Sequence, residues 1–194
     1  MAINLSMRQL IKPGLSALVA TVLEEAGLRP GQLELELKEA ALVHDYVASA
    51  ATLVELKELG ARVTLDDFGN GGASAISYLR RLPIDFIKLD RTLIQETGHH
   101  GTERIVALAL TELAHSLVIK VVAEGVETLS ELSFLREAGC DVIQGYLVSP
   151  PLDEDGITAW LGHAPPVLWN GATPTTRPRR GRPRSKARPK QGNG

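Results

Sequence analysis

The apolar residues of this chain recur with two spacings, and the two spacings alternate along the sequence. Short runs rich in Leu, Val and Ile predict strands, and stretches with apolar residues three or four positions apart predict amphipathic helices. The predicted strands span residues 2–5, 33–37, 61–66, 85–90, 119–124 and 140–146, and the predicted helices span 13–27, 45–59, 76–82, 102–117, 129–138 and 153–161. Strands that alternate with helical crossovers predict an α/β fold with a parallel sheet.

A charged or amide residue stands at the C-terminal end of each predicted strand. These residues are Asn4, Glu36, Asp66 with Asp67, Lys88, Glu124 and Gln144. In a (β/α) barrel the active site is assembled at the C-terminal ends of the strands, so residues far apart in sequence would converge there. Carboxylate and amide oxygens are the ligands that hard divalent cations prefer. The pattern therefore favours a metal or phosphate site at this end of the sheet.

The segment Val63–Gly72 concentrates this chemistry, because an apolar strand ends there in two adjacent aspartates and a glycine-rich turn. Adjacent carboxylates repel each other, and a shared proton or a divalent cation relieves the repulsion. The alternative is structural, since Asp is also common just after a strand, where it closes a turn or caps a helix. The segment by itself leaves both interpretations open.

Two charged residues inside predicted strands also have structural alternatives. Lys88 interrupts an apolar strand, and such a lysine needs a carboxylate partner or a ligand phosphate because an unpaired buried ammonium is very costly. Glu34 alternates with leucines, which is typical of a strand with one solvated face. Glu36, two positions later, is the candidate to point into a polar cavity instead.

The composition is that of one folded domain. With 194 residues and 44% hydrophobic content, the chain can bury one sizeable core. The single cysteine, Cys140, excludes an internal disulfide and a multi-cysteine metal site, which favours a reducing, cytoplasmic location. No apolar run approaches the roughly 20 residues that a membrane-spanning helix needs.

The net charge of −2 conceals an acidic body and a basic tail. Residues 1–170 contain 13 Lys and Arg against 23 Asp and Glu, while residues 171–194 contain basic residues and no acid. In the tail Pro, Arg, Gly, Thr and Lys dominate and apolar periodicity vanishes, so we expect disorder. We therefore divide the chain into a folded domain, residues 1–162, and a disordered basic Pro/Arg-rich tail, residues 163–194.

Several segments resemble, in the same order, the EAL-domain family of cyclic di-GMP phosphodiesterases. They are Asn4–Ser6, Leu33–Glu36, Leu65–Gly69, Leu79–Pro83, Ile87–Asp90, Val122–Glu127 and Gln144–Tyr146. The resemblance covers residues 2–162 and implies a TIM-like (β/α)8-type barrel, incomplete here with about six of its eight strands. It also implies metal-dependent hydrolysis of cyclic di-GMP to linear pGpG, with two Mg²⁺ or Mn²⁺ ions.

By position, the resemblance implies a set of metal ligands. Asn4, Glu36 and Asp66 correspond to ligands of one metal, and Asp66, Asp67 and Glu124 to ligands of the second, so that Asp66 would bridge the two. Two metals can stabilise both the entering and the leaving oxygen of an in-line phosphodiester displacement, which agrees with this ligand set.

The resemblance also implies catalytic and substrate-binding residues. Lys88 corresponds to the lysine that orients the attacking water or hydroxide, and Glu127 and Gln144 correspond to residues that support the metal-bound water network. Asp90 corresponds to a further polar residue near the ligand. Its structural alternative is an ion pair with Lys88 or Arg91.

The chain departs from the family pattern at four places. The Glu-Ala-Leu signature belongs to a strand before Asn4 and is absent, since Glu39–Leu42 is a near match on the wrong element. The loop at residues 70–75 is one residue longer, lacks a tyrosine and has extra glycine. Lys38 replaces a small hydroxyl residue and places a cation beside the metal site. The basic tail is the fourth departure.

The loop after the aspartate pair has a predicted support. Glu39 corresponds to a residue that braces this loop, and Ser74 is its expected partner within the loop.

These departures leave three hypotheses for the function. The first is a cyclic di-GMP phosphodiesterase, complete only if an upstream Glu-Ala-Leu strand is encoded in frame or supplied in trans. The second is a non-catalytic cyclic di-GMP-binding or protein-interaction module, and the third is a nonfunctional gene fragment. With a metal ligand missing, we expect negligible hydrolysis by the 194 residues alone. With two open sheet edges, we expect low stability or association into homo-oligomers.

Three further features have structural interpretations. His99 and His100 lie between glycines, which is typical of a solvated loop rather than a metal pair. Cys140 enters an apolar strand, as a small core residue does. Arg180–Arg184 resembles an AT-hook, whose arginines favour the narrow, negative minor groove of A·T-rich DNA. Short basic tails also occur as nonspecific appendages.

The basic tail allows a direct test of nucleic-acid binding. If the tail binds DNA, truncation after Asn170 should abolish binding to an A·T-rich duplex, and binding by the intact chain should fall steeply with salt because counterions are released from the phosphates. Fluorescence anisotropy with a labelled duplex measures both effects. No detectable binding by the intact chain at low salt would remove the hypothesis.

Overall fold

The computed structural model describes residues 1–39, 46–69, 79–95 and 101–163. Among these residues six strands form one parallel sheet in the order β1-β2-β3-β4-β5-β6. The strands are β1 (Ala2–Asn4), β2 (Glu34–Lys38), β3 (Arg62–Phe68), β4 (Phe86–Leu89), β5 (Lys120–Ala123) and β6 (Val142–Ile143). The helices are α1 (Met7–Leu10), α2 (Leu15–Glu25), α3 (Tyr46–Glu58), α5 (Arg91–Gln95), α6 (Gly101–Ser116), α7 (Leu129–Ala138) and α8 (Glu154–His163), with a short 3-10 helix, η1 (Pro30–Gln32). The predicted α/β fold with a parallel sheet is confirmed.

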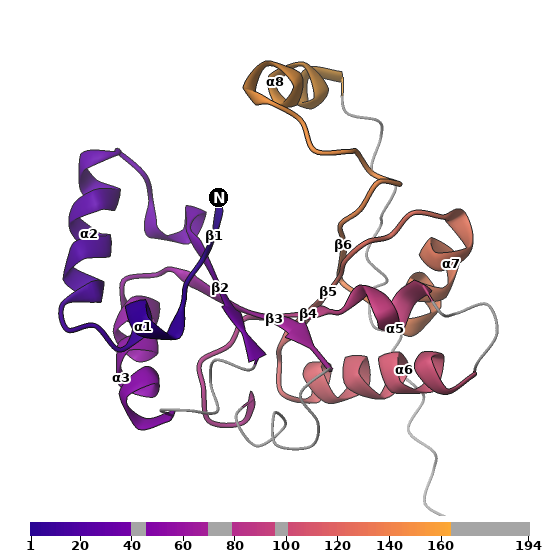
Figure 1. The fold of residues 1–194 in the computed structure, drawn as a ribbon, viewed down its shortest axis with the longest axis horizontal. Helices are drawn as coiled ribbons and strands as arrows, with labels where there is room; N and C mark the ends of the chain where they lie inside the picture. The colour runs from indigo at the N-terminus through magenta and orange to yellow at the C-terminus, as the bar shows by residue number, and fades with distance from the viewer. Residues whose placement is uncertain (40–45, 70–78, 96–100, 164–194) are drawn as a thin grey trace, which may run out of the picture.

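The sheet is an open arc with helices α2, α3, α6 and α7 on its outer, convex side (Figure 1). Strands β1 and β6 lie at the two ends of the arc, and each pairs with a single neighbour among the described residues. Helix α8 stands apart from the other helices in this view. A curved parallel sheet with helices outside is the arrangement of a (β/α) barrel, here not closed.

The hydrophobic core lies between the sheet and these helices. In paired parallel strands, residues in register point to the same face, so alternate positions of neighbouring strands form one layer. Leu35 is in register with Val63, and Leu65 is in register with Ile87. The buried layer consists of Leu35, Leu37, Val63, Leu65, Ile87, Leu89, Val121 and Ala123. The residues between these positions point to the concave face, where the strand-end polar residues lie.

Glu34 is half-buried on this concave face rather than fully solvated. Its Oε1 accepts a hydrogen bond of 2.6 Å from the hydroxyl of Thr64, which is fully buried. The leucines and glutamates of β2 therefore lie on opposite faces of the sheet, as the alternation predicts. The face with the glutamates, however, lies on the inside of the arc and is not fully exposed to solvent.

The structure contains two short helices, α1 and α5, that the apolar periodicity did not predict. They have 4 and 5 residues, too few for a helical period to be visible. A capping box begins α1, because the backbone N–H of Ser6 donates to the Gln9 side chain while Ser6 Oγ accepts from the Gln9 backbone. Most of the predicted helix at 76–82 lies outside the described residues.

Strand β6 is shorter than predicted because the chain turns toward the loop that follows β5. The Val126 backbone N–H donates to the Gln144 carbonyl at 3.1 Å, and Leu147 N–H donates to the Val126 carbonyl at 3.0 Å. A Cβ placed on Gly145 would lie 2.3 Å from Val126 backbone atoms, so only glycine permits this approach. The contact ends the regular ladder and fixes the backbone at Gln144.

Two aspartates lock neighbouring strands at the end of the sheet where the strands begin. Asp85, just before β4, accepts a hydrogen bond of 2.8 Å from Val63 N–H at the start of β3 and also pairs with Lys57. Asp141, just before β6, accepts one of 2.8 Å from Val121 N–H at the start of β5. Each aspartate thereby fixes the position of one strand relative to the next.

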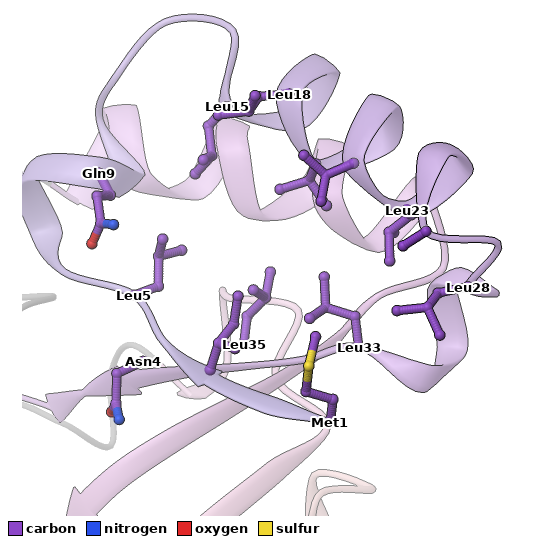
Figure 2. Close-up of a pocket in the computed structure, with 14 residues that line it drawn as sticks. Met1, Asn4, Leu5, Gln9, Leu15, Leu18, Leu23, Leu28, Leu33 and Leu35 are labelled. Atoms are coloured by element: carbon purple, nitrogen blue, oxygen red, sulfur yellow. The ribbon is translucent and has the colours of Figure 1, made fainter.

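An apolar cavity of about 320 Å³ lies between α2 and the edge strands β1 and β2 (Figure 2). Leu5, Leu33 and Leu35 approach it from the strand side, and Leu23 approaches it from the helix. The side chain of Asn4 points to the opposite side of β1. Even at the edge of the sheet, the alternating side chains therefore form an apolar face toward the helices and a polar face on the other side.

No helix within the described ranges is both long enough and apolar enough to cross a membrane. Helix α8 ends at His163, and residues 164–194 lie outside the described residues. The boundary at residue 162 and the disorder of the tail therefore stay predictions. His99 and His100 also lie outside the described residues.

Cys140 is a buried core residue, as predicted, and we expect its thiol to be unreactive in the native protein. Its side chain is 1% exposed, its Sγ lies 3.3 Å from the Val121 carbonyl, and burial raises the pKa of the thiol to about 12. Only the thiolate attacks thiol reagents. At mildly alkaline pH, a disulfide reagent such as DTNB should label the chain only as denaturant unfolds it. Rapid stoichiometric labelling of the native chain would contradict the buried position.

Candidate active site

Strand alternation and stagger bring the strand-end residues to one face and one end of the sheet. Asn4 is in register with Glu36, and Lys88 is in register with Val122, two residues before Glu124. Asp66 lies two residues beyond the position that is in register with Glu36. Relative to the strand register, the site residues on β3 and after β5 therefore lie two positions farther toward the C-terminal end of the sheet than their neighbours Glu36 and Lys88. Such a shift is typical of the staggered sheet of a barrel.

The ammonium group of Lys88 is the centre of the site. Its Nζ lies 2.7 Å from Glu36 Oε1, 2.8 Å from Glu124 Oε1 and 3.9 Å from Asp66 Oδ1. The lysine side chain is 7% exposed. Carboxylates from β2, β3 and the residue after β5 thus supply the partners that a lysine inside an apolar strand requires.

Lys88 carries a proton over the whole physiological pH range. Burial alone would lower its pKa, but hydrogen bonds to Glu124 and Glu36 outweigh burial and raise the pKa of Lys88 from 10.5 to about 12. Because the folded-state pKa is the higher one, these ion pairs contribute fully to stability below pH 10.5, and the contribution is lost as the pH rises through 12. At neutral pH Lys88 is therefore a hydrogen-bond donor and not a base.

Asp66 has an unsatisfied oxygen inside this cluster. Its Oδ1 is buried and accepts no hydrogen bond from the part of the chain that the structure describes. The distance of 3.9 Å to Lys88 Nζ is too long for a hydrogen bond. A buried carboxylate oxygen without a donor is costly, so this oxygen would gain from an additional cation.

Asp67 turns away from Asp66 and has a different partner. It adopts a φ of 56°, a left-handed conformation that costs a non-glycine residue on the order of 1 kcal/mol. The pairing of β3 with β4 shifts in register between Leu65 and Phe68, at the same place. The Asp67 carboxylate pairs with Lys38 Nζ at 3.0 Å. The two adjacent acids are thus neutralised by two different lysines.

Residues 70–78, where a turn or helix capped by the aspartate pair would continue, lie outside the described residues, so the capping alternative stays open. Glu39 supports the start of the turn. It is buried, and its Oε2 accepts a hydrogen bond of 3.0 Å from Gly69 N–H. This contact agrees with the predicted bracing role of Glu39, whereas its predicted partner Ser74 lies outside the described residues.

Glu127 is positioned by residues that our sequence interpretation missed. Its carboxylate pairs with Arg91, and its backbone N–H donates to Glu131 Oε2 at 2.8 Å. Glu131 is buried and forms a capping box with Thr128 at the start of α7. The Thr-x-x-Glu spacing is the sequence signature of such a box, so this signal could have identified Glu131 as a residue that positions Glu127.

The remaining candidates lie around this cluster. Asn4 and Gln144 are exposed, and the described contacts do not join their side chains to the acids around Lys88. Asp90 Oδ1 accepts hydrogen bonds from the backbone N–H and the hydroxyl of Thr92, so it caps the start of α5. Of the candidate residues, Glu36, Asp66, Lys88 and Glu124 therefore lie closest together.

The donor chemistry of the site fits a hard divalent cation. Its oxygens are carboxylate oxygens, one of which is orphaned, and such oxygens are the ligands of Mg²⁺ and Mn²⁺. Within the described ranges, no three acidic or histidine side chains stand ready to hold an ion, because Lys88 Nζ lies where the carboxylates converge. A bound cation would take over part of the charge neutralisation that the lysine now provides.

Comparison with known proteins identifies relatives of this chain. The family model described as "EAL domain" matches residues 1–151. The cyclic di-GMP phosphodiesterase NbdA of Pseudomonas aeruginosa is 41% identical over 171 residues, which is 86% of this chain and 22% of that protein. The chain thus spans about a fifth of the length of this curated relative.

Solved structures share the fold of the described residues. The PaMucR phosphodiesterase in complex with c-di-GMP has a TM-score of 0.75 and 36% identity, with 80% of this chain and 69% of that chain covered. The manganese and cyclic di-GMP complex of Klebsiella pneumoniae BlrP1 has a TM-score of 0.72 and 35% identity, with 77% of this chain and 38% of that chain covered. The predicted TIM-like fold class is confirmed by these structures.

Replacing Lys88 with methionine tests its role as the shared counter-ion. Without divalent metal, we expect Lys88→Met to lower the free energy of unfolding by about 3 kcal/mol, because three partly buried carboxylates lose their cation. Added Mn²⁺ should restore more stability to this variant than to the original chain. Urea unfolding followed by circular dichroism measures both effects.

Lys120→Met is the matched control, because Lys120 is an exposed lysine at the start of β5, away from the acids. It should change stability by less than about 0.5 kcal/mol. Equal stability of Lys88→Met and the original chain in metal-free buffer would show that the acids do not depend on this lysine.

Proposed function

The chain belongs to the EAL domain family, and from this premise we propose that its strand-end site is where cyclic di-GMP is hydrolysed to linear pGpG with the help of Mg²⁺ or Mn²⁺. The observation that carries the proposal is the convergence of Glu36, Asp66 and Glu124 on Lys88, with one Asp66 oxygen left unsatisfied. The names of relatives, a cyclic di-GMP phosphodiesterase and a phosphodiesterase complex with c-di-GMP, support the choice of substrate.

The reaction replaces one phosphodiester bond by a bond to water. A water oxygen attacks one phosphorus atom of the cyclic dinucleotide, the bond from phosphorus to the 3′ oxygen breaks, and a proton passes to that oxygen. The product keeps a 5′ phosphate, as in linear pGpG. An attack of this kind develops negative charge on the phosphate and on the leaving oxygen, so cations at the site lower its barrier.

The residues of the chain divide into cation-holding and positioning groups. Asn4, Glu36, Asp66, Asp67 and Glu124 would hold the divalent cations, which neutralise phosphate charge and make water a better nucleophile when bound. Lys88 keeps its proton at neutral pH, so it donates hydrogen bonds that orient the attacking water or a phosphate oxygen.

Three further residues complete the proposal. Glu127 and Gln144 would accept hydrogen bonds from water around the substrate, and Asp90 would contact the substrate. The capping box of α7 and the ion pair with Arg91 support the role of Glu127, since both restrict its position.

A second candidate function is binding of cyclic di-GMP without turnover. The observation that favours it is the exposure of β1, whose three residues all lie open to solvent at the edge of the sheet. Asn4 is therefore not packed against the acidic cluster. A ligand site with loosely held metal ligands would bind the dinucleotide but stabilise the transition state less. The expectation of negligible hydrolysis by the 194 residues alone stays a prediction.

The other expected partners are proposals as well. Association of chains would use the exposed edges β1 and β6, which pair on one side only among the described residues. Binding of DNA would use the basic tail, and the reducing setting inferred from the single cysteine favours a cytoplasmic location.

Replacing Asp66 with asparagine tests the site. In the presence of Mn²⁺ we expect the chain to bind cyclic di-GMP, and we expect EDTA or Asp66→Asn to weaken binding at least about tenfold because a ligand charge is removed. Wherever pGpG formation is measurable, Asp66→Asn should lower its rate on the order of a thousandfold. Calorimetry measures binding, and chromatography of pGpG measures turnover.

Asp155→Asn serves as the control, because Asp155 is an exposed acid at the start of α8 and should leave binding unchanged. Metal-dependent formation of pGpG would favour the enzyme, and metal-dependent binding without product would favour the second candidate. Binding that neither EDTA nor Asp66→Asn affects would overturn the proposed site.

A further inference from the structure

Lys38 is a cation that belongs to the acidic site but not to its centre. It is the last residue of β2, in register with Asp66, and its Nζ lies 3.0 Å from Asp67 Oδ2. The Lys38 and Asp67 side chains are 67% and 41% exposed. One acid of the adjacent pair is therefore already engaged by a lysine that faces solvent.

We propose that Lys38 competes with a divalent cation for the Asp67 carboxylate and thereby sets how tightly that half of the site holds its metal. The inference rests on the proposed function, which makes Asp67 a metal ligand. Lys38 would then be a positioning residue that acts through Asp67, and it would make the second metal easier to lose than the ligand set alone implies.

The distribution of charge at the site supports competition. Lys88 pairs with Glu36 and Glu124 inside the cluster, whereas Lys38 pairs with Asp67 alone among the ion pairs of the described residues. The Lys38 ammonium lies 3.0 Å from the Asp67 carboxylate and so places a positive charge directly beside this acid. A metal that uses Asp67 therefore has to displace a positive charge or bind next to it.

The exposure of the pair sets the size of the effect. A solvent-exposed ion pair is weak, and breaking one typically changes an equilibrium by no more than about fivefold. Lys38 is thus displaced by a divalent cation at a modest loss of affinity rather than excluding it.

The surrounding turn confines the exchange to the Asp67 side chain. Lys38 and its neighbour Glu39 both reach across to the turn after β3, but they hold different parts of it. Glu39 accepts a hydrogen bond from Gly69 N–H, and a Cβ on Gly69 would lie 2.8 Å from Leu93, so the backbone at Gly69 is closely packed. Release of Asp67 by Lys38 would therefore leave Gly69 held by Glu39.

Direct measurement of Mn²⁺ binding tests the proposal without any substrate. We would compare the full chain with Lys38→Met, Asp67→Asn and the double variant, following free Mn²⁺ by electron paramagnetic resonance. Lys38→Met should bind Mn²⁺ about fivefold more tightly. In the Asp67→Asn background the same substitution should change affinity by less than about twofold, because the contested carboxylate is gone.

Lys120→Met is the charge-matched control, since Lys120 is an exposed lysine at the far end of the sheet and should leave Mn²⁺ affinity unchanged. Thermal unfolding of each variant verifies that it is folded. Unchanged affinity in Lys38→Met, or an increase that persists in the Asp67→Asn background, would overturn the proposal, as would absence of Mn²⁺ binding by all variants. Because no nucleotide is present, failure to bind or hydrolyse cyclic di-GMP would count against the proposed function alone.

Discussion

The site depends on one interaction, the pairing of a buried ammonium with carboxylates from separate strands. Lys88 lies on β4, and its partners Glu36 and Glu124 come from β2 and from the residue after β5. An unpaired charge at this position would be very costly, so the lysine and the acids stabilise one another only when the strands stand in the correct register. The ion pairs that join β2, β4 and the end of β5 therefore also bring the candidate site residues together.

Contacts at the opposite end of the sheet fix the strand register on which this interaction depends. Asp85 ties the start of β4 to β3, and Asp141 ties the start of β6 to β5, each through a hydrogen bond from a backbone N–H at 2.8 Å. The strand starts are thus fixed by short polar contacts, and the strand ends carry the reactive groups. This division between a stabilising end and a functional end is a general property of (β/α) barrels.

Two lysines give the acidic site two kinds of neutralisation. Lys88 is buried among its acids, whereas Lys38 is exposed and holds only Asp67. The buried pair resists exchange, and the exposed pair exchanges readily with ions from solvent. If the site binds divalent cations as proposed, the half around Lys88 is organised without metal, and the occupancy of the half at Asp67 would respond to the metal concentration.

The sequence by itself determined the parallel α/β fold and placed polar residues at the ends of its strands, because period-2 and period-3.6 patterns and polar strand ends are local signals. Of these polar residues, the structure joins Glu36, Asp66, Lys88 and Glu124. The sequence did not predict the short helices α1 and α5, since 4 and 5 residues show no period. The Thr128–Glu131 capping box is visible in the sequence, but the contact of Glu131 with Glu127 appears only in the structure.

Only the tertiary structure decided which acids share Lys88, that Asp66 keeps an unsatisfied oxygen, and that Asp67 turns to Lys38 instead. These outcomes depend on the stagger between strands and on one left-handed residue at the end of β3. The contacts of Lys38 with Asp67 and of Glu39 with Gly69 join residues 29 and 30 positions apart, and such contacts form only when the sheet forms. Because the interaction between charges depends on their distance, two lysines that look alike in the sequence acquire different roles in the folded protein.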